Sequence, residues 1–294
     1  MNDDVEVPAV LYHYTSNNAF LSILKSRELR LSALSQSNDS LEGKWLLHAL
    51  KSECREQGIN QDHRQQIADF AEYVFKWVMG YGFCLSSDRD QLSQWRGYAD
   101  DGRGVAIGFK TNELLKLTNF ASVSRGKTEL KKVLYEVEEH RLHVAPIVKK
   151  LFEASRNLPL DDSLRLAFGA DQDSVEKDHP VASIRSAILG AVGSMFQLKS
   201  TAFKEESEWR ILSETFLLSE NGKRAPTDDN LSFTSSGPRI IPHHVIKFPE
   251  SSDDLISFVV LGPKNNTPWS IIDMACHAAG VPTHGIGNSM ASYR

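Results

Sequence analysis

The sequence predicts an α+β fold in which short strands from both ends of the chain flank a helical segment. Between about 138 and 198, apolar residues recur at the three- and four-residue spacing of a helix, and strand-like stretches precede and follow this part. Turn-forming residues cluster at 219–237, which we interpret as a surface loop. The 294 residues show no internal repeat, so we expect a single domain, 1–294, with a helical insertion at about 138–198.

The elements before residue 135 follow from local patterns. A strand is expected at 11–15, and Ser16 then offers a cap to a helix. Leucines that alternate with polar residues predict a second strand at 29–31. Helical periodicity is clearest over 62–79, and Gly80 would end that helix. The other elements expected here are strands at 81–87, 105–109 and 132–135 and a helix at 91–98.

Strands return after the helical insertion. Apolar and β-branched runs predict strands at 208–212, 245–248 and 258–261. The stretch 269–279 has the pattern of a last helix. Strands on both sides of a helical middle are typical of the α+β class.

Composition argues against several classes of protein. A net charge of −5 and a pI near 6.1 provide no overall positive field that would draw the chain to nucleic acid or anionic lipid. The three cysteines form no CxxC pair, so neither a disulfide framework nor a structural zinc is expected. The acidic N-terminus and the lack of an apolar run of about 20 residues indicate a cytoplasmic protein without a membrane segment.

Several familiar motifs are missing from the sequence. It contains no GxGxxG after a strand, no GxxxxGK[ST], no HExxH and no GxSxG. Dinucleotide-binding Rossmann domains, P-loop enzymes, zinc proteases and α/β-hydrolases are therefore not indicated. The candidate residues are instead polar side chains inside expected strands.

His13 and the Glu206/Glu208 pair are the main candidates. His13 lies between two tyrosines on a strand and would face away from both. It could equally be a core histidine with locally satisfied ring nitrogens. Glu206 and Glu208 are two apart and would share one strand face. If that face is exposed they need no function, whereas in a cleft their repulsion would separate their pKa values.

Other polar residues have two interpretations each. Ser86 is a site candidate, and Ser87 is expected to cap the following helix. Trp95 and Tyr98 lie one helical turn apart and either pack that helix on the sheet or face a ligand. Arg210, with Lys199 and Lys204, could bind phosphates or form an ordinary basic strand edge. Asn38-Asp39 followed by Glu42 is typical of a turn before a helix.

Seven short blocks in a fixed order resemble DUF2971, a bacterial family of unknown function, over nearly the whole chain. The blocks are Tyr12–Ser16, Asn38-Asp39-x-x-Glu42, Cys84–Ser86, Trp95-x-x-Tyr98-Ala99, Gly104-x-x-Ile107-Gly108-Phe109, Lys199 to Arg210 with Glu206-x-Glu208, and Val260–Lys264. That family in turn resembles the ADP-ribosyltransferase fold, in which a split β-sheet binds NAD. The resemblance implies such a split-sheet core here.

The resemblance also assigns roles. It places His13 on the first strand, where it would bind the adenosine ribose, Ser86 on a middle strand and Glu208 as the late-strand catalytic glutamate. Glu206 would complete the Glu-x-Glu spacing and accept a proton. The implied catalytic residues are Glu208, Glu206 and His13, and the implied NAD-binding residues are His13, Tyr14, Thr15, Ser86, Trp95, Tyr98 and Arg210. A middle-strand serine, where histidine-type members usually carry tyrosine, departs from the pattern.

The implied function is that of an NAD-dependent ADP-ribosyltransferase, a bacterial toxin or anti-phage effector that modifies a protein or a nucleic acid and has an antitoxin or regulatory partner. No metal is required. The basic stretch Arg125, Lys127, Lys131 and Lys132 could meet a nucleic-acid acceptor. The alternatives are a non-catalytic nucleotide-sensing domain and an NAD glycohydrolase. Glu208→Gln is expected to abolish NAD consumption and leave the thermal unfolding midpoint nearly unchanged.

Overall fold

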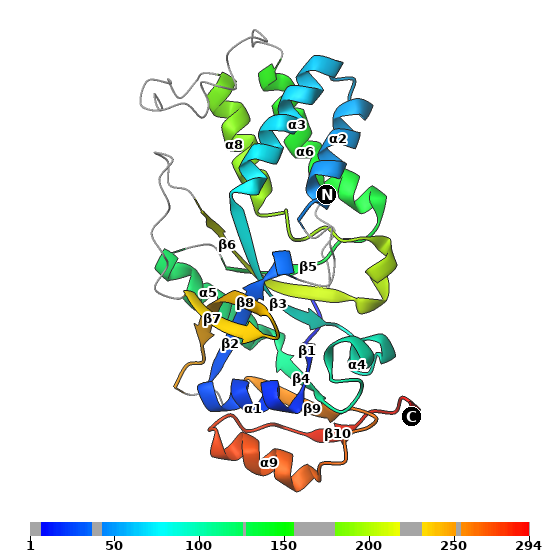
Figure 1. Cartoon of the computed structure of the whole chain (residues 1–294), viewed down its shortest axis with the longest axis vertical. Helices are drawn as coiled ribbons and strands as arrows, with labels where there is room; N and C mark the ends of the chain where they lie inside the picture. The colour runs from blue at the N-terminus through cyan, green and yellow to red at the C-terminus, as the bar shows by residue number, and fades with distance from the viewer. Residues whose placement is uncertain are drawn as a thin grey trace.

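The computed structural model describes residues 7–36, 43–125, 128–155, 180–217, 231–250 and 254–293. It confirms a mixed α+β protein, with one ten-stranded and mostly antiparallel sheet (Figure 1). The strands are β1 Val10–Thr15, β2 Glu28–Ala33, β3 Val78–Ser86, β4 Val105–Lys110, β5 Glu129–Lys132, β6 Glu208–Phe216, β7 Leu231–Ser236, β8 Arg239–Lys247, β9 Ile256–Leu261 and β10 Ile286–Asn288. The helices are α1 Asn17–Ser26, α2 Trp45–Glu56, α3 Gln61–Lys76, α4 Leu92–Tyr98, α5 Thr111–Arg125, α6 Val137–Ser155, α8 Pro180–Val192 and α9 Trp269–Ala278, with 3-10 turns η1 Leu34–Gln36 and η3 Thr201–Glu206.

The sheet branches at β3. Its main path runs β10-β9-β4-β1-β3-β2-β8-β7, and β6 also pairs with β3 and carries β5. β6 pairs with β3 along its whole length, whereas β1 meets β3 only at Ser86 and β2 only at Tyr81 and Gly82. The strands β1 and β2 therefore pair with different parts of β3, and among the described residues β6 is the only strand that pairs with residues 83–85.

The N-terminal elements agree with the sequence. Ser16 caps α1, where its Oγ accepts a hydrogen bond from the backbone N–H of Ala19 at 3.2 Å. Phe20 and Leu24 of α1 are buried against the sheet. This helix ends at Arg27, whose side chain donates to the backbone carbonyls of Pro249, Glu250, Ala279 and Gly280.

The boundary between α3 and β3 differs from the expectation. The helix ends at Lys76, and Gly80 lies inside the strand instead of terminating the helix. A Cβ atom on Gly80 would lie 2.1 Å from the ring of Phe196. The glycine is therefore needed because a distant aromatic ring packs on the strand, which local sequence does not reveal.

The helical part of the protein comes from two segments of the chain. In Figure 1, α2, α3, α6 and α8 lie together above the sheet, and they share one hydrophobic core with Val78 of β3 and Leu212 of β6. Helices α6 and α8 confirm the helical character of 138–198 among the described residues, while 156–179 lie outside them. Helix α2, which joins this lobe, follows the turn expected before a helix at Asn38-Asp39 and Glu42, whereas α5 was not predicted.

Two expected boundaries are wrong. Residues 231–236 of the expected surface loop form β7, which pairs with β8, and 218–230 lie outside the described residues. The strand expected at 132–135 is β5 at Glu129–Lys132. Pairing with β6 fixes that register, because Leu130 faces Ile211 across the ladder.

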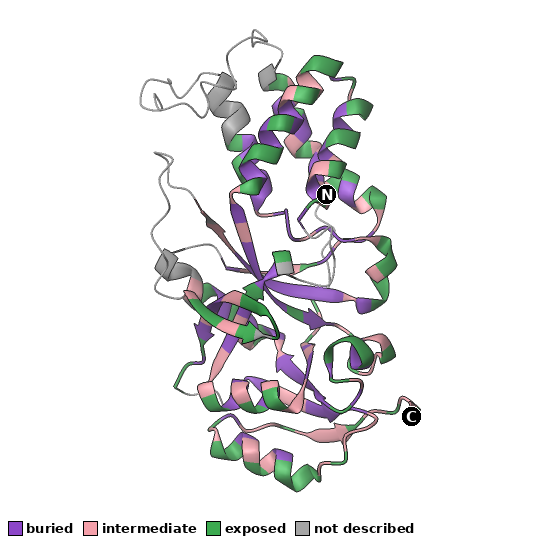
Figure 2. Ribbon diagram, viewed as in Figure 1, coloured by how far each residue is buried: buried purple, intermediate pink, exposed green. Residues whose placement is uncertain are grey.

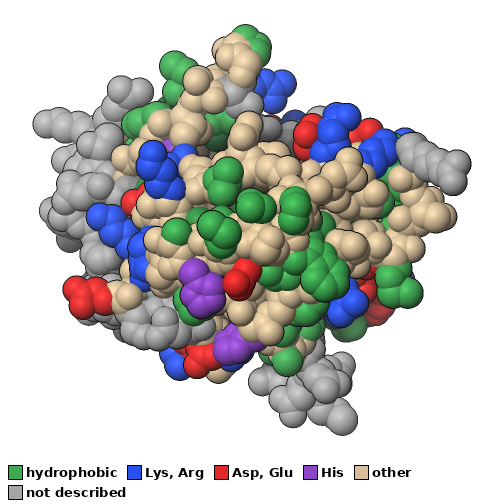
Figure 3. Space-filling view, turned by 90° about the horizontal axis from the view of Figure 1, so that it is seen from below, with side chains coloured by type: hydrophobic (Ala, Val, Ile, Leu, Met, Phe, Trp, Pro, Cys, Tyr) green, Lys and Arg blue, Asp and Glu red, His purple; other side chains and the backbone are tan. Residues whose placement is uncertain are grey.

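Burial follows this architecture. The strands are mostly buried and the outer faces of the helices are exposed (Figure 2). Seen from below, hydrophobic side chains gather over part of the surface (Figure 3), and on α9 Trp269, Ile271 and Met274 are at least half exposed. Within the described ranges no helix is long and apolar enough to cross a membrane.

Candidate functional site

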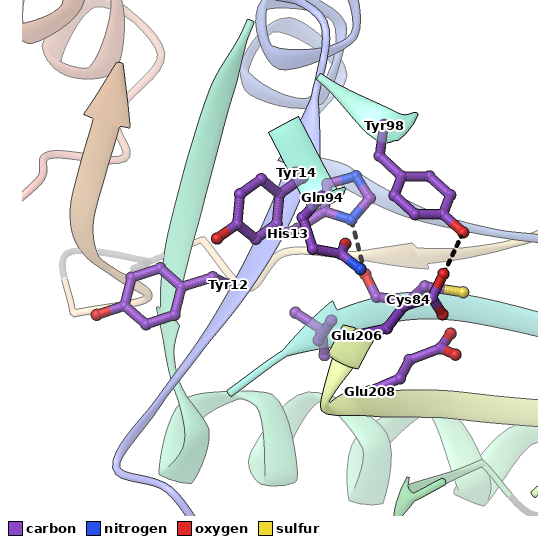
Figure 4. Close-up of a pocket in the computed structure, with 9 residues that line it drawn as sticks. Tyr12, His13, Tyr14, Cys84, Gln94, Tyr98, Glu206 and Glu208 are labelled. Atoms are coloured by element: carbon purple, nitrogen blue, oxygen red, sulfur yellow. Dashed lines mark hydrogen bonds between the residues drawn. The ribbon is translucent and has the colours of Figure 1, made fainter. Parts of the chain in front are cut away.

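A pocket with a cavity volume of about 50 Å³ opens where β1 leaves β3 (Figure 4). It is lined by Tyr12, His13, Tyr14, Cys84, Leu85, Gln94, Tyr98, Glu206 and Glu208. These residues come from β1, β3, α4, η3 and β6. β1 and β6 are not neighbours, because β3 lies between them. Their side chains nevertheless converge in this pocket, as the sequence predicted for His13, Tyr14, Tyr98, Glu206 and Glu208.

His13 is held in one orientation. Its ring stacks on Phe83 with centroids 4.1 Å apart, and its Nδ1 lies 2.8 Å from the backbone oxygen of Cys84. A carbonyl oxygen only accepts, so Nδ1 carries the proton and Nε2 is an acceptor. Burial lowers the pKa of His13 to about 4, which the bond to Cys84 only partly offsets. His13 is therefore neutral at physiological pH.

Glu206 and Glu208 do not share a strand face. Glu206 ends the 3-10 turn η3, Ser207 adopts a left-handed conformation with φ of 46°, and Glu208 begins β6. Their carboxylates still meet, because Lys199 Nζ donates to Glu206 Oε2 and, at 2.9 Å, to Glu208 Oε2. The turn at Ser207 replaces the strand geometry that the spacing suggested.

A buried ion network lies behind the two carboxylates. Arg210 is 1% exposed and bonds both oxygens of Glu208, with Nε 2.8 Å from Oε1 and Nη2 3.0 Å from Oε2. Its Nη1 donates to the backbone oxygen of Phe196 at 2.8 Å. Neither Arg210 nor Lys199 lines the cavity. Arg210, which the sequence analysis assigns to NAD binding, lies beneath Glu208 and outside the cavity lining.

Glu208 is a permanent anion at neutral pH. Burial alone would raise its pKa, but the charges of Arg210 and Lys199 outweigh it and hold the pKa of Glu208 at about 2. The backbone N–H of Glu208 donates to the hydroxyl of Tyr135 at 2.9 Å. The carboxylate therefore brings negative charge to the pocket and cannot act as an acid there.

Tyr98 and Gln94 reach the pocket from α4. The Tyr98 hydroxyl donates to Glu206 Oε1 at 2.9 Å, and burial together with Glu206 raises the pKa of Tyr98. Gln94 is 8% exposed, lines the cavity, and makes no hydrogen bond through its side chain within the described part of the chain. The side-chain amide of Gln94 is therefore available for a hydrogen bond to a ligand in the pocket.

The remaining expected site residues support the pocket from outside its lining. Ser86 Oγ donates to the backbone oxygen of Glu206 at 2.7 Å and accepts from Asp88 N–H at 3.1 Å. Trp95 is fully buried, and its Nε1 donates to Asp90 Oδ1 at 2.7 Å. Thr15 is buried in β1. Ser87 does not cap α4, whose N-cap is Gln91.

Tyr14 lines the pocket but uses its hydroxyl structurally. The hydroxyl donates to Asp88 O at 2.7 Å and accepts from Gln91 N–H at 3.0 Å. Its ring meets Trp95 edge-on, with centroids 4.8 Å apart. Tyr14 therefore fixes the loop that leads into α4 rather than offering a free group to a ligand.

The predicted site residues did not include four lining residues, Tyr12, Cys84, Leu85 and Gln94, or the bridging role of Lys199. Cys84 as a residue is exposed, but loss of water around its thiol and the charge of Glu208 raise the pKa of the thiol well above its ordinary value, so it stays protonated. The signal available for Gln94 was its position four residues before Tyr98 on the expected helix 91–98, which places the two on one helix face. Among the described residues, no group of three or more His, Cys, Asp and Glu side chains is placed to hold a metal ion.

Two further groups of residues from the sequence analysis are the Asn38-Asp39-x-x-Glu42 block and the basic stretch. Asn38, Asp39 and Glu42 lie outside the described residues, as does Lys127 of the basic stretch. Lys131 of that stretch bonds Glu129 at 3.0 Å and the backbone oxygen of Gly193 at 2.7 Å. Its charge is therefore engaged within the protein.

Comparison with known protein families gives a match over part of the chain. Residues 94–211, about two fifths of its length, match the family described as protein of unknown function (DUF2971). The resemblance to DUF2971 is thereby confirmed for this segment, which holds Gln94, Tyr98, Glu206 and Glu208 but not His13. Comparison with curated proteins and with solved structures gave no significant match. None of these comparisons shows a resemblance to ADP-ribosyltransferases.

Proposed function

We propose that the pocket binds NAD and that the protein transfers its ADP-ribose to a protein or nucleic-acid acceptor. One observation carries this proposal: a histidine from β1, an aromatic residue from α4 and two carboxylates, one at the end of η3 and one at the start of β6, converge on one pocket at the branch of the sheet. These are the residues to which the resemblance assigns NAD cleavage. The ADP-ribosyltransferase relationship of the fold is part of the same proposal.

The chemistry suits the charges of the site. When the bond between ribose C1′ and the nicotinamide nitrogen breaks, its electron pair leaves with nicotinamide and the ribose becomes an oxocarbenium-like cation. The ionised Glu208 would balance that charge. The acceptor then forms a bond to C1′ and loses a proton, which Glu206 would take.

The size of the pocket adds a requirement. A cavity of about 50 Å³ is about a third of the volume, about 150 Å³, that encloses a benzene ring. Only a small part of NAD enters it as it stands. The proposal therefore requires Tyr98, which is 41% exposed, to turn outward when the dinucleotide binds.

Glu208→Gln tests the proposal directly. We expect the wild type to release nicotinamide from NAD, and the variant to lose at least about a hundredfold in rate, as on loss of a preorganised electrostatic group. Sequence alone predicts an unchanged unfolding midpoint, but breaking a buried ion network costs about 3–5 kcal/mol. The assay is therefore run below the unfolding temperature of both proteins.

Arg27→Ala is the matched control. It removes the four hydrogen bonds from Arg27 to backbone carbonyls and destabilises the protein outside the pocket. If Arg27→Ala loses as much nicotinamide release as Glu208→Gln at equal folded fraction, the catalytic assignment is wrong. Full activity of Glu208→Gln would contradict it as well.

A second candidate is a nucleotide-binding domain without turnover. Arg210 and Lys199 already bond both carboxylate oxygens of Glu208. This pairing favours the second candidate, because a fully paired carboxylate interacts less strongly with a substrate. NAD labelled in the adenine ring separates the candidates. Label in macromolecules indicates a transferase, free ADP-ribose a glycohydrolase, and bound but intact NAD a receptor.

Growth of a bacterial host tests the toxin or anti-phage role. We expect expression of the wild type to reduce viability, and expression of Glu208→Gln at the same level to leave it unchanged. A co-expressed antitoxin or regulatory partner would restore growth. Equal toxicity of both proteins would separate the effect from NAD cleavage.

A further inference from the structure

Gln94 carries the one pocket-lining amide of the described residues, and its polar atoms have no protein partner. The residue is 8% exposed and lines the cavity, and Figure 4 shows its amide beside the ring of His13 and near Cys84. Its amide is not among the unpaired side-chain atoms of the described residues that are closed to water, so it is accessible from the cavity that Gln94 lines. A ligand in the cavity can therefore bond this amide.

The helix that carries Gln94 is fixed at several points. Backbone N–H of Gln91 donates to Tyr14 at 3.0 Å, and Trp95 Nε1 donates to Asp90 at 2.7 Å. Asp90 also accepts from the backbone N–H of Met290 at 2.6 Å. The position of the Gln94 amide is therefore set before a ligand arrives, which lowers the entropic cost of binding.

The other polar groups of the wall are mostly acceptors. Nε2 of His13 carries a lone pair, because Nδ1 donates to Cys84 O. Glu206 and Glu208 present carboxylates, and their cationic partners Lys199 and Arg210 are not part of the lining. A ligand group that brings N–H or O–H donors matches this wall, and an anion meets two like charges.

We propose that the pocket binds a neutral or positively charged group that carries N–H or O–H donors, and that Gln94 is the residue that recognises it. An amide, an amidinium or a pair of hydroxyls has this chemistry. Gln94 can donate to such a group and accept from it, since its amide has both functions. The phosphates of a larger ligand stay outside the pocket. This inference rests on the proposed function only in that it concerns the same pocket.

Three small probes of equal shape test the inference. Acetamide, acetamidinium and acetate are planar and differ in donors and charge, and each is far smaller than a nucleotide. Binding is measured by NMR titration at constant ionic strength, following the backbone amide signals of the pocket-lining residues in every variant. In the wild type the side-chain amide signal of Gln94, which its absence in Gln94→Leu identifies, is followed as well. We expect acetamide and acetamidinium to bind at least about tenfold more tightly than acetate, which has no donor and meets two carboxylates.

Two substitutions assign the recognition to Gln94. Gln94→Leu should weaken acetamide binding about tenfold, the loss of one or two hydrogen bonds. Gln94→Glu should raise the preference for acetamidinium over acetamide, because it adds a negative charge. Gln91→Leu is the control on the same helix, as the Gln91 side chain neither caps α4 nor lines the cavity.

The inference fails if acetate binds as well as acetamide, if neither donor-bearing probe binds, or if Gln94→Leu binds acetamide like the wild type. Unfolding midpoints of the variants are recorded in parallel, and Gln94→Glu gives the test should Gln94→Leu not fold. The probes contain no nucleotide. Their binding can therefore support the inference when NAD is not cleaved, and NAD cleavage can persist when the probes do not discriminate.

Discussion

Glu208 and Arg210, two residues apart on β6, bond each other through both carboxylate oxygens in a place almost closed to water. Lys199 adds a second cation to Glu208 and bridges it to Glu206. Burying four charges is unfavourable unless each is paired. The pairing here is complete, so removal of one member leaves an uncompensated charge. The network accounts for the closeness of two carboxylates that would otherwise repel each other.

His13 gives the protein a specific response to acid. Its pKa is about 4 when folded and about 6.5 when unfolded. Below pH 6.5 the unfolded chain takes up a proton that the folded chain does not, so stability falls as the pH drops from 6.5 to 4. We expect His13→Gln to remove about 2 kcal/mol of this loss, after allowance for the partial exposure of the ring.

Urea unfolding of wild type and His13→Gln at pH 7 and pH 4 measures the difference. Glu208 responds in another window, because its lowered pKa makes its contribution to stability disappear only between about pH 4.5 and 2. An equal loss of stability in both proteins between pH 7 and 4 would show that the ring of His13 is not held neutral by the fold.

Helix α4 shows how a short element is positioned. It has seven residues, and its N-cap makes no side-chain hydrogen bond, so its own stability is small. Asp90 stands just before it and accepts from Ser289 Oγ at 2.5 Å, Met290 N–H at 2.6 Å and Trp95 Nε1 at 2.7 Å. After the helix, Asp101 accepts from the Tyr293 hydroxyl at 2.6 Å. The segment 289–293 thus ties down both ends of α4.

Asp90→Asn should loosen this helix. An amide oxygen replaces a carboxylate that accepts three hydrogen bonds, and we expect a loss of about 2 kcal/mol. Hydrogen exchange should become faster for the amides of α4 and for 289–291. Asp88→Asn is the control, because only the backbone of Asp88 is bonded to Tyr14 and Ser86. Unchanged exchange in Asp90→Asn would mean that α4 is held by its apolar face alone.

At the scale of the whole molecule, β3 and β6 join the helical lobe to the sheet. Both strands contribute to the core of α2, α3, α6 and α8, through Val78 and Leu212, and other residues of the same strands lie in the core of the sheet. Phe196 sits at this junction, where its ring covers Gly80 and its backbone oxygen accepts from Arg210. The two cores are therefore expected to unfold together.

Phe196→Ala tests this coupling. The residue is buried, and its truncation should lower the free energy of unfolding by about 3–5 kcal/mol. Denaturation followed by circular dichroism and by tryptophan fluorescence should give coincident transitions in wild type and variant. Phe233→Ala, at a position 60% exposed on β7, should change stability by less than about 0.5 kcal/mol. Separate transitions for the two probes would show that the lobe unfolds on its own.

Local patterns determined several elements of this protein. The strand at β1, the cap at Ser16, the amphipathic α1 and α3 and the last helix α9 agree with the structure, because short-range propensity and periodicity specify them. The ordered blocks also indicated residues of the pocket before its shape was known. These features need no knowledge of what lies across the fold.

Other features depended on how the chain is arranged in three dimensions. Gly80 belongs to a strand because Phe196 packs on it, and Glu206 meets Glu208 through the turn at Ser207 and the bridge from Lys199. Gln94 became a candidate only when its amide was found unpaired in the pocket. By itself the sequence determined the strands, helices and chemical types of side chain, whose patterns are local. Only the tertiary structure decided which charges pair and which polar group is left for a ligand, because the path of the chain in space, and not the sequence spacing, brings Lys199 and Arg210 onto Glu208.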